Sequence, residues 1–234
     1  MIHLIDDSLA DPATQVDLDA RLFHELENGN GSETLRCWES VRTAVVVSAL
    51  APISQQVHED ACRQDDVPVL RRISGGGAVV IGRGCLNYSL ILSLDARPEL
   101  RSVSDSYCRI LTSIKDALAI PLLAVRGESD LAIADRKISG NSQRRGRHTL
   151  LHHGTILYDF DSALMDRYLR TPARMPKYRG DRIHTEFVTN VPLTRHDIVQ
   201  AITAAASERV GPADRCPAQP QSSHSHKPPG RVGS

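Results

Sequence analysis

The clearest pattern in the chain is an alternation of apolar and polar residues that begins at Leu86. The even-numbered positions from 86 to 94 are leucine or tyrosine, and Asn87, Ser89 and Ser93 lie between them. Side chains of a strand point alternately to its two faces, so the pattern predicts a strand with one face in the core. Apolar runs predict further strands at residues 43–49, 67–74 and 148–160.

Helical spacing of apolar residues appears in two other regions. Leu18, Leu22 and Leu26 form one stripe, which predicts a helix that ends at the Asn28–Gly29 pair. Apolar residues recur every three or four positions from 103 to 118, which predicts a second helix. Shorter capped helices are expected from Ser54 toward Asp66, after Asp161, and after Thr194 to about Arg209.

Residues 129–140 predict a hairpin that turns at Ala134–Asp135. Hairpins and long connections mixed with helices indicate an α+β fold, with a mixed, largely antiparallel sheet flanked by helices. We expect one domain over residues 1–210. Residues 211–234 hold five of the 13 prolines and almost no large apolar residue, so they are predicted to form a disordered tail.

The charge balance excludes some classes of function. Lys plus Arg and Asp plus Glu each total 28, which argues against broad binding to nucleic acid or to an anionic membrane surface. Early acidic residues argue against a signal peptide, and no apolar run is long enough to span a bilayer. The five cysteines are scattered without CxxC spacing, which predicts a reduced cytoplasmic protein and no metal site.

Three consecutive glycines, Gly75 to Gly77, follow the predicted strand that contains Arg71 and Arg72. Such a turn can present several backbone N–H groups to an anion, and the arginines could add charge. A tight turn between strands is the structural alternative. Neither GxGxxG nor GK[ST] is present, so an anion site here would lie between strands rather than at a helix N-terminus.

Lys137 lies on the return strand of the predicted hairpin. Only four of the 28 basic residues are lysines, so a lysine in this chain is less readily explained as ordinary surface charge. A compact ammonium can follow negative charge as it moves from a carbonyl oxygen to a phosphate. His152 and His153 should face opposite sides of their strand and cannot easily share one metal ion, and Gly154 permits close approach of a ligand or chain.

Four ordered motifs resemble the lipoate–protein ligase A family, within the larger group of biotin and lipoate ligases and octanoyltransferases. The resemblance covers residues 17 to 193, and its motifs are "LRRISGGGAVV" with "GCLNYSLIL", "SDLAIADRKISGNSQRR", "LLHHGTIL" and "YRGDRIHTEFVTNVPL". It implies a class II synthetase-like α+β domain. It also implies that lipoate or octanoate reacts with ATP and Mg²⁺ to give acyl-AMP, and that the acyl group then passes to a lysine of a carrier protein.

The resemblance implies a catalytic role for Lys137, in contact with the acyl phosphate. The residues it implies around the substrate and the adenylate are Arg72, Ser74, Gly75, Gly76, Gly77, Ala78, Asn87, Asp130, Ser139, Gly140, His153 and Gly154. The expected carrier is a glycine-cleavage H-like protein, a dehydrogenase E2 domain or a lipoate-binding protein of sulfur oxidation. Two-domain members carry an accessory domain, which a separate protein could supply here.

The sequence departs from the family pattern at two places. Ile81, Gly82 and Arg83 stand where many members have His or Asp, and Ser129 replaces an Asn. Two alternative functions are an ATP-independent acyltransferase that acts through a cysteine thioester, and a non-catalytic lipoyl-binding protein. The transferase needs a reactive thiolate. Cys85 is the nearest candidate, and we predict that it is not a nucleophile.

Overall fold

A computed structural model describes residues 2–8, 11–172 and 175–207. The predicted tail, residues 211–234, therefore lies outside the described residues, as does the expected helix end at Arg209. Within the described chain, strands and helices alternate irregularly, and the predicted α+β class is confirmed.

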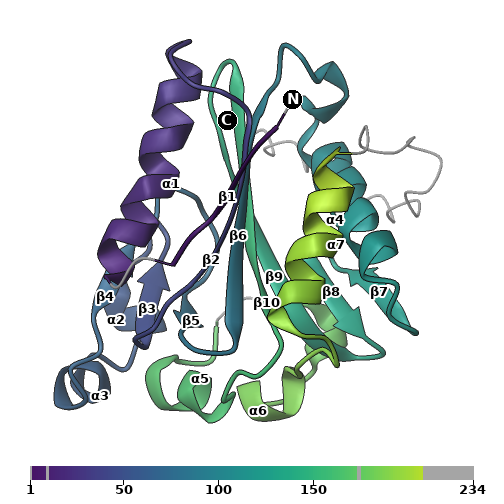
Figure 1. Ribbon diagram of the computed structural model, residues 1–234. Coiled ribbons are helices and arrows are strands. Elements are labelled where there is room, and N and C mark those ends of the chain that lie inside the picture. The colour runs from purple at the N-terminus through teal and green to yellow at the C-terminus, as the bar shows by residue number, and fades with distance from the viewer. Residues whose placement is uncertain (1, 9–10, 173–174, 208–234) are drawn as a thin grey trace, which may run out of the picture.

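A twisted sheet runs through the middle of the molecule (Figure 1). In the described residues it has seven strands, in the order β1 (His3–Asp6), β2 (Thr34–Glu39), β6 (Cys85–Ser93), β10 (Thr149–Leu157), β9 (Arg136–Arg145), β8 (Asp130–Ile133) and β7 (Leu123–Arg126). Only the β1–β2 pair is parallel among these strands. A smaller sheet has the order β4 (Val69–Arg71), β3 (Ala44–Val47) and β5 (Val79–Ile81).

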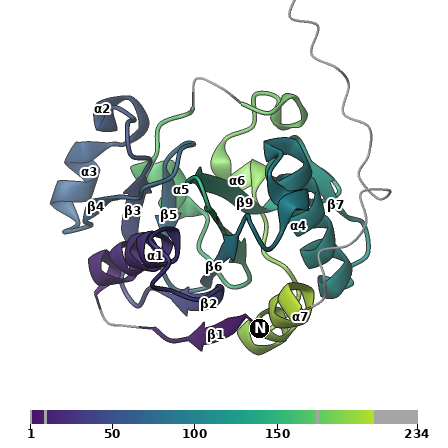
Figure 2. The same cartoon turned by 90° about the horizontal axis from the view of Figure 1, so that it is seen from above.

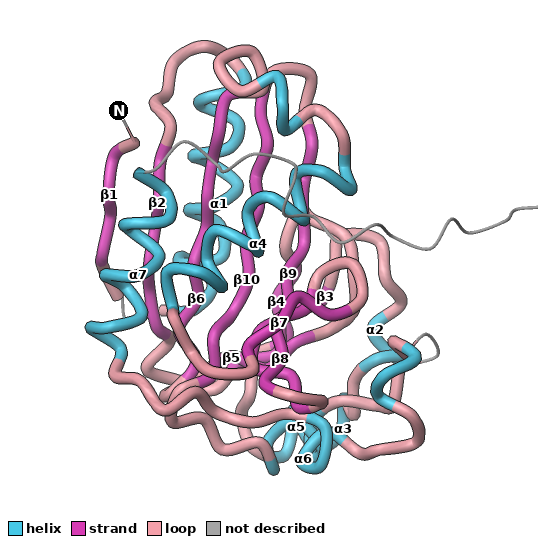
Figure 3. The backbone as a smooth tube through the Cα atoms, turned by 90° about the vertical axis from the view of Figure 1, so that its right-hand side faces the viewer, coloured by secondary structure: helices cyan, strands magenta, loops and turns pink. Residues whose placement is uncertain are grey.

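Helices cover both faces of the main sheet. Figure 3 shows α4 (Val103–Leu118) and α7 (Arg195–Ser207) in front of the sheet and α1 (Pro12–Glu27) behind it. The small sheet lies on the same side as α1 (Figure 2). The remaining helical segments are short: α2 (Ile53–Gln56), α3 (Glu59–Gln64), α5 (Ala163–Tyr168), α6 (His184–Phe187), and the 3₁₀ turns η1 (Pro98–Leu100) and η2 (Lys177–Arg179).

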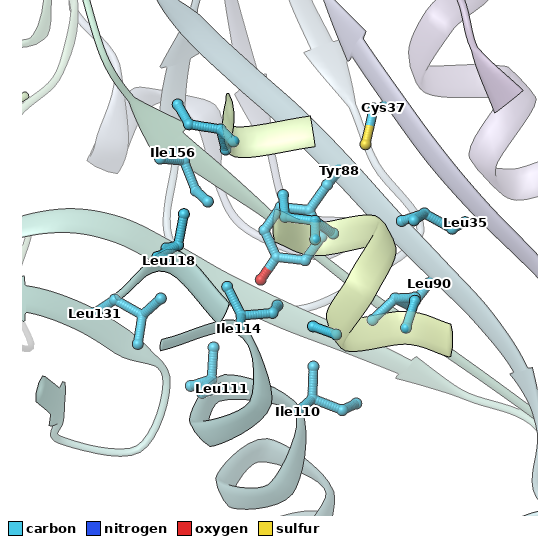
Figure 4. Packing of buried hydrophobic residues seen from close by; sticks show 14 of the residues in the cluster. Leu35, Cys37, Tyr88, Leu90, Ile110, Leu111, Ile114, Leu118, Leu131 and Ile156 are labelled. Carbon is cyan, nitrogen blue, oxygen red and sulfur yellow. The ribbon is translucent and has the colours of Figure 1, made fainter. Parts of the chain in front are cut away.

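The alternation from Leu86 is confirmed, because its apolar face forms the centre of the largest core cluster. Tyr88 and Leu90 of β6 pack with Leu111 and Ile114 of α4 in this cluster (Figure 4). The opposite face of β6 carries Ser89, which bonds a residue of α1. The sheet therefore has an apolar side under α4 and α7 and a partly polar side under α1.

The helix predicted to end at the Asn28–Gly29 pair is confirmed as α1, with Asn28 as its C-cap, but the helix expected after Ser54 was wrong in detail. The most deeply buried face of α1 contains Val16, Asp19 and Phe23, whereas Leu18 is only partly buried. The helix expected after Ser54 is split into α2 and α3, because Val57 between them adopts extended geometry and forms a bridge with Leu169. Burying Val57 against that partner outweighs the local helical preference.

The predicted hairpin turn and the caps of α5 and α7 are present, but Ser54 lies inside α2 and forms no cap. Ala134 adopts the left-handed conformation at the hairpin turn, with φ of 51°. Asp161 accepts a hydrogen bond from the backbone N–H of Ala163 at the start of α5. Thr194 and Asp197 form the reciprocal capping pair at the start of α7. No helix in the described ranges is both long and apolar enough to cross a membrane.

His152 is a fully buried polar residue within the apolar side of the sheet. Gln143 lies 3.0 Å from its Nδ1, and the Tyr88 hydroxyl lies 3.4 Å from its Nε2. Burial, with the nearby charge of His153, lowers the pKa of His152 to about 3. In the pH range in which the unfolded chain takes up a proton at His152, the folded protein therefore keeps this side chain neutral.

This difference predicts a pH-dependent stability. An unfolded His titrates near 6.5, so protons bind the unfolded chain first and stability falls as pH drops below that value. Between pH 7.5 and pH 5 we expect His152 to account for a loss of about 2 kcal/mol. Urea unfolding at both pH values measures it. The loss should disappear in His152→Gln and persist in His24→Gln, which changes an exposed histidine; equal losses in all three proteins would contradict it.

Candidate active site

The three glycines lie in the loop between β4 and β5, which flank β3 on opposite sides. The loop therefore crosses one end of the small sheet. Gly76 has φ of 92°, a conformation that disfavours other residues. Gly75 and Gly77 have no protein atom within 4 Å of the position that a Cβ would occupy. The protein's own packing therefore does not explain the absence of side chains at these two positions.

Arg72 holds the glycine loop together from within. Its Nε donates to Ser74 Oγ at 2.9 Å, and its Nη2 donates to the carbonyls of Gly75 and Gly77 at 2.6 and 2.8 Å. Its Nη1 reaches the Val46 carbonyl of β3 at 3.3 Å. Burial lowers the pKa of Arg72 to about 10, so the group remains charged at neutral pH. In this arrangement the guanidinium organises the loop.

Arg71 is also bound to backbone carbonyls. Its Nη1 lies between 3.0 and 3.2 Å from the carbonyl oxygens of Ser48, Ala49 and Ala51. Of the two arginines expected to supply charge to an anion, one therefore braces the loop and the other braces the segment after β3. Backbone N–H groups of the loop remain the means by which it could contact an anion.

A buried polar relay ties the loop to α1. Ser74 Oγ accepts from Arg72 and lies 2.6 Å from His153 Nε2. His153 Nδ1 then donates to Asp19 Oδ2 at 3.5 Å, and Arg36 donates to Asp19 Oδ1 at 2.7 Å. The order resembles a nucleophilic Ser–His–Asp triad, but Ser74 is 1% exposed and its oxygen already accepts a donor. The relay therefore positions the loop.

The charge on Asp19 is maintained despite its burial. Burial raises the pKa of Asp19, but the hydrogen bond from His153 and the charge of Arg36 outweigh this effect, so the pKa lies below its ordinary value. The side chains of Asp19 and Arg36 are 8% and 0% exposed. Removing one partner of such a pair leaves an uncompensated buried charge, which typically costs about 3–5 kcal/mol.

Lys137 forms the centre of a second cluster. Its Nζ lies 2.7 Å from Asp130 Oδ1, and the Tyr178 hydroxyl donates to the other oxygen of Asp130 at 2.8 Å. A Cβ on Gly140 would lie 2.7 Å from Lys137 Nζ, so this glycine leaves room for the ammonium. Burial, with the neighbouring Asp130 charge, raises the pKa of Tyr178 and keeps it a hydrogen-bond donor.

The segment after α5 closes over the Lys137 strand. Thr189 N–H donates to the Lys137 carbonyl at 2.9 Å, and Arg136 Nη2 donates to the Val188 carbonyl at 2.7 Å. The ring of Phe187 lies 5.2 Å from that of Tyr178. The fourth sequence motif therefore packs against the second.

The glycine loop and the lysine cluster meet along β9. Ser142 Oγ donates to the Gly75 carbonyl at 2.8 Å. Gly140 lies two residues earlier on the same strand and therefore on the same face. On β10, His153 and Gly154 pair with Ser142 and Asn141. Most predicted residues are thus brought to one region of the main sheet beside the loop.

Gly154 is explained by a neighbouring side chain. A Cβ there would lie 1.9 Å from Asn141 Oδ1. That oxygen accepts from the Tyr88 hydroxyl, and Asn141 Nδ2 donates to Ser129 O at 2.8 Å and Ser139 Oγ at 3.1 Å. The predicted close approach at Gly154 is therefore made by the chain itself, and Ser139 is a buried anchor for Asn141.

Three expected or candidate residues lie outside these contacts. Asn87 is 6% exposed, and its amide donates to the carbonyls of Trp38 and Cys85. Ala78 is partly buried and packs on the core beneath the small sheet. Cys85 is fully buried, and burial raises the pKa of its thiol to about 12. A thiolate at Cys85 is therefore strongly disfavoured.

Several residues of the two clusters were missed by sequence reasoning. Asp19 lies within an ordinary-looking helix, and only its position beside the buried Val16 and Phe23 distinguishes it. Tyr178 and Ser142 lie inside quoted motifs, but nothing in their spacing indicates that they reach Asp130 and Gly75. Both contacts join segments 48 and 67 residues apart in the chain.

Comparison with solved structures defines the class of fold. The chain is similar to a lipoate-protein ligase A bound with ATP, with a TM-score of 0.73 and 18% identity, covering 88% of this chain and 84% of the other. It is also similar to a putative lipoate protein ligase from T. acidophilum with bound lipoic acid, with a TM-score of 0.72, 18% identity and the same coverage. The expected α+β ligase fold is confirmed.

The family follows from the sequence match. The chain belongs to the family of the lipoyl protein ligase A/B catalytic domain, and the match to this family covers residues 11–206. It is 27% identical over 174 residues to a probable lipoate-protein ligase A of Mycoplasma pneumoniae, covering 74% of this chain and 50% of that protein. It is 30% identical over 141 residues to a putative one of Schizosaccharomyces pombe, covering 60% and 38%. The chain thus spans half or less of these two relatives.

The Arg72 contacts generate a testable expectation. Arg72→Gln should leave loop carbonyls and Ser74 without donors, which we expect to destabilise the fold by roughly 2–4 kcal/mol and to loosen the loop. Hydrogen exchange followed by mass spectrometry should show faster exchange in peptides covering residues 72–78. Arg71→Gln is the matched control, because its carbonyl partners lie outside the loop. Unchanged exchange in the Arg72 variant would show that the loop holds its shape without the guanidinium.

Proposed function

We propose that this protein ligates lipoate, or octanoate, to a lysine of a carrier protein at the expense of ATP, through an acyl-AMP intermediate. Two observations together carry the proposal. Lys137 is held by Asp130, and the glycine loop in the same region leaves open space at Gly75 and Gly77. The family membership supports the same activity.

The proposed position of the mixed anhydride is along the backbone of the glycine loop. Gly75 and Gly77 leave open space beside the main chain, and Gly76 needs its left-handed conformation. The N–H groups of such a turn can face phosphate or carboxylate oxygens without steric hindrance. Arg72, Ser74 and His153 hold the loop in shape, while Ala78 anchors it to the core beneath the small sheet.

Lys137 is proposed to stabilise the charge that develops in both half-reactions. In the first, a carboxylate oxygen attacks the α-phosphorus of ATP, and pyrophosphate leaves. In the second, an amine attacks the acyl carbon, and AMP leaves. Both steps move negative charge onto oxygens near the acyl phosphate, and a partly exposed ammonium held by Asp130 and given room by Gly140 can follow it.

Related proteins support the choice of substrates. The solved relatives include one bound with ATP, one with lipoic acid, and a bipartite ligase from Thermoplasma acidophilum described with its E2 lipoyl domain. We propose ATP, lipoate and a lipoyl-type carrier domain for this chain, together with an accessory domain on a separate protein. The catalytic unit proposed is residues 1–210, with 211–234 as a tail.

Mg²⁺ is proposed as a partner of the nucleotide. The described residues contain no group of three or more His, Cys, Asp or Glu that could hold a metal ion. Asp130 lies in the site, but its two oxygens contact Lys137 and Tyr178. Mg²⁺ commonly binds through substrate phosphates and waters with one or two carboxylates, so the ion would be held mainly by ATP and would neutralise its phosphate charge.

The transferase alternative is weakened by the environment of Cys85. Its fully buried thiol has a pKa of about 12, and a thioester mechanism needs a thiolate. A non-catalytic lipoyl-binding role differs from ligation in one measurable respect, since it consumes no ATP. Release of pyrophosphate on incubation with lipoate and ATP, followed by lipoylation of an E2 lipoyl domain, tests the proposed function directly.

Replacing Lys137 should slow catalysis strongly without unfolding the protein. We expect Lys137→Ala to reduce ligation by two to three orders of magnitude, which corresponds to roughly 3–4 kcal/mol of transition-state stabilisation. The matched control is Lys115→Ala, because Lys115 has a similar side-chain exposure, 30% against 29%, and lies on α4. Initial rates of pyrophosphate release and carrier lipoylation measure the effect; near-normal rates in the Lys137 variant would remove this residue from the site.

Removing the Cys85 thiol should leave the reaction intact. AMP is already a good leaving group, so the proposed ligase needs no covalent enzyme intermediate. Cys85→Ala should therefore keep ATP-dependent ligation within about tenfold of the wild type, a barrier change under roughly 1.4 kcal/mol. Loss of all activity in the variant, together with an acyl-cysteine detected by mass spectrometry in the wild type, would replace the ligase proposal with the transferase.

A further inference from the structure

His184 and Asp166 form a rigid pair at the edge of the lysine cluster. His184 Nδ1 lies 2.9 Å from Asp166 Oδ1. The same carboxylate accepts from the backbone N–H groups of His184 and Thr185 at 2.9 and 3.1 Å. Three bonds thus fix the carboxylate against the start of α6. Because an ionised carboxylate only accepts, Nδ1 carries the proton and Nε2 has a free lone pair.

Nε2 of His184 is available to a ligand. It makes no hydrogen bond within the described part of the chain, and it is not among the buried atoms there that lack a partner, so it reaches solvent. The His184 side chain is 11% exposed. The imidazole is therefore mostly enclosed, with its orientation fixed through Nδ1 and its basic nitrogen left unused by the fold.

His184 also lies near enough to Lys137 for the ammonium charge to lower the pKa of the imidazole. It precedes Phe187 by three residues on α6, so the two side chains lie on neighbouring positions of one helix face. Phe187 packs on Tyr178, whose hydroxyl bonds Asp130, the partner of Lys137. One turn after His184, Val188 pairs with Lys137 itself. His184 is therefore connected to Lys137 through both its helix and a packed aromatic pair.

The charged groups around His184 favour its neutral form. Burial and the positive charges of Arg179 on η2 and Lys137 on β9 lower the pKa of His184, and together they outweigh the opposing effect of Asp166 on α5. An unperturbed His titrates near 6.5. At neutral pH the imidazole is thus uncharged and able to take a proton.

We propose that His184 is the general base for the acyl-transfer step, which accepts the proton of the carrier lysine at Nε2. The inference rests on the proposed ligase function. The amine nitrogen bonds to the acyl carbon, and the bond from that carbon to the phosphate oxygen breaks. AMP leaves with the bonding electrons, and the proton lost by the amine passes to Nε2. Lys137 and His184 then have separate roles, one on the leaving phosphate and one on the nucleophile.

The two half-reactions distinguish a general base from a structural residue. Adenylate formation involves no amine, so it should not need His184. His184→Asn is the test variant, because its side-chain amide can still donate to Asp166 as Nδ1 does, while the position of Nε2 is left empty. His196→Asn is the control, because His196 is exposed on α7. Pyrophosphate release with lipoate and ATP measures the first half-reaction, and transfer from synthetic lipoyl-AMP to an E2 lipoyl domain measures the second.

In His184→Asn we expect pyrophosphate release within about threefold of the wild type and transfer slowed by about a hundredfold or more, the usual range for loss of a general base. The wild-type transfer rate should fall as pH drops through the pKa of His184, below 6.5, because the protonated ring cannot accept a proton. This fall in transfer rate at low pH should be absent in His184→Asn and present in His196→Asn.

Two results would overturn the inference. One is an equal loss in both half-reactions, which would mean that His184 only supports the site. The other is a transfer rate in His184→Asn, or a fall of that rate at low pH, that matches the wild type. Failure of the proposed function has a different signature: the wild type would release no pyrophosphate with lipoate and ATP. The assay with synthetic lipoyl-AMP would still report on His184 in that case.

Discussion

The register of β9 against β10 determines which side chains share the site. His153 pairs with Ser142, and Gly154 pairs with Asn141. In this register His153 reaches Ser74 of the glycine loop, Ser142 reaches Gly75, and the Asn141 side chain lies over the glycine. A slip of one residue would move each side chain to the opposite face. The Gly154–Asn141 contact opposes such a slip, because any other residue at 154 would clash with the amide.

Buried polar groups, rather than apolar packing alone, place the glycine loop. The relay from Arg72 through Ser74 and His153 ends at Asp19, which Arg36 neutralises. The side chains from Arg72 to Asp19 are each hydrogen-bonded by their neighbours, and a missing one would leave a buried group unpaired at a cost of about 1–3 kcal/mol or more. Such networks favour one arrangement over many similar ones. The loop can therefore keep an exposed, side-chain-free surface and still have a defined shape.

Two separate segments of the chain supply the side chains of the lysine cluster and its surroundings. The hairpin of β8 and β9 supplies Asp130 and Lys137, and the segment from η2 to α6 supplies Tyr178 and His184. The two are joined by Tyr178 to Asp130 and by Thr189 to the Lys137 carbonyl. In the proposed reaction the leaving phosphate and the incoming amine need different groups, and the two segments would each supply one of them.

The sequence by itself determined the main elements of the fold and nominated the members of the proposed site. Alternation fixed the two faces of β6, local hydrogen-bonding residues fixed the caps of α5 and α7, and the motifs around Gly75 and Lys137 were recognisable because their residue types act locally. The tertiary structure alone decided which polar groups meet. Arg72 holds the glycine loop, Asp19 accepts a hydrogen bond from His153 at the end of the relay, and Tyr178 donates to Asp130. The contacts of Asp19 and Tyr178 join separate elements, as does the bond from Arg72 to the Val46 carbonyl, and their energy depends on burial that local sequence patterns do not encode.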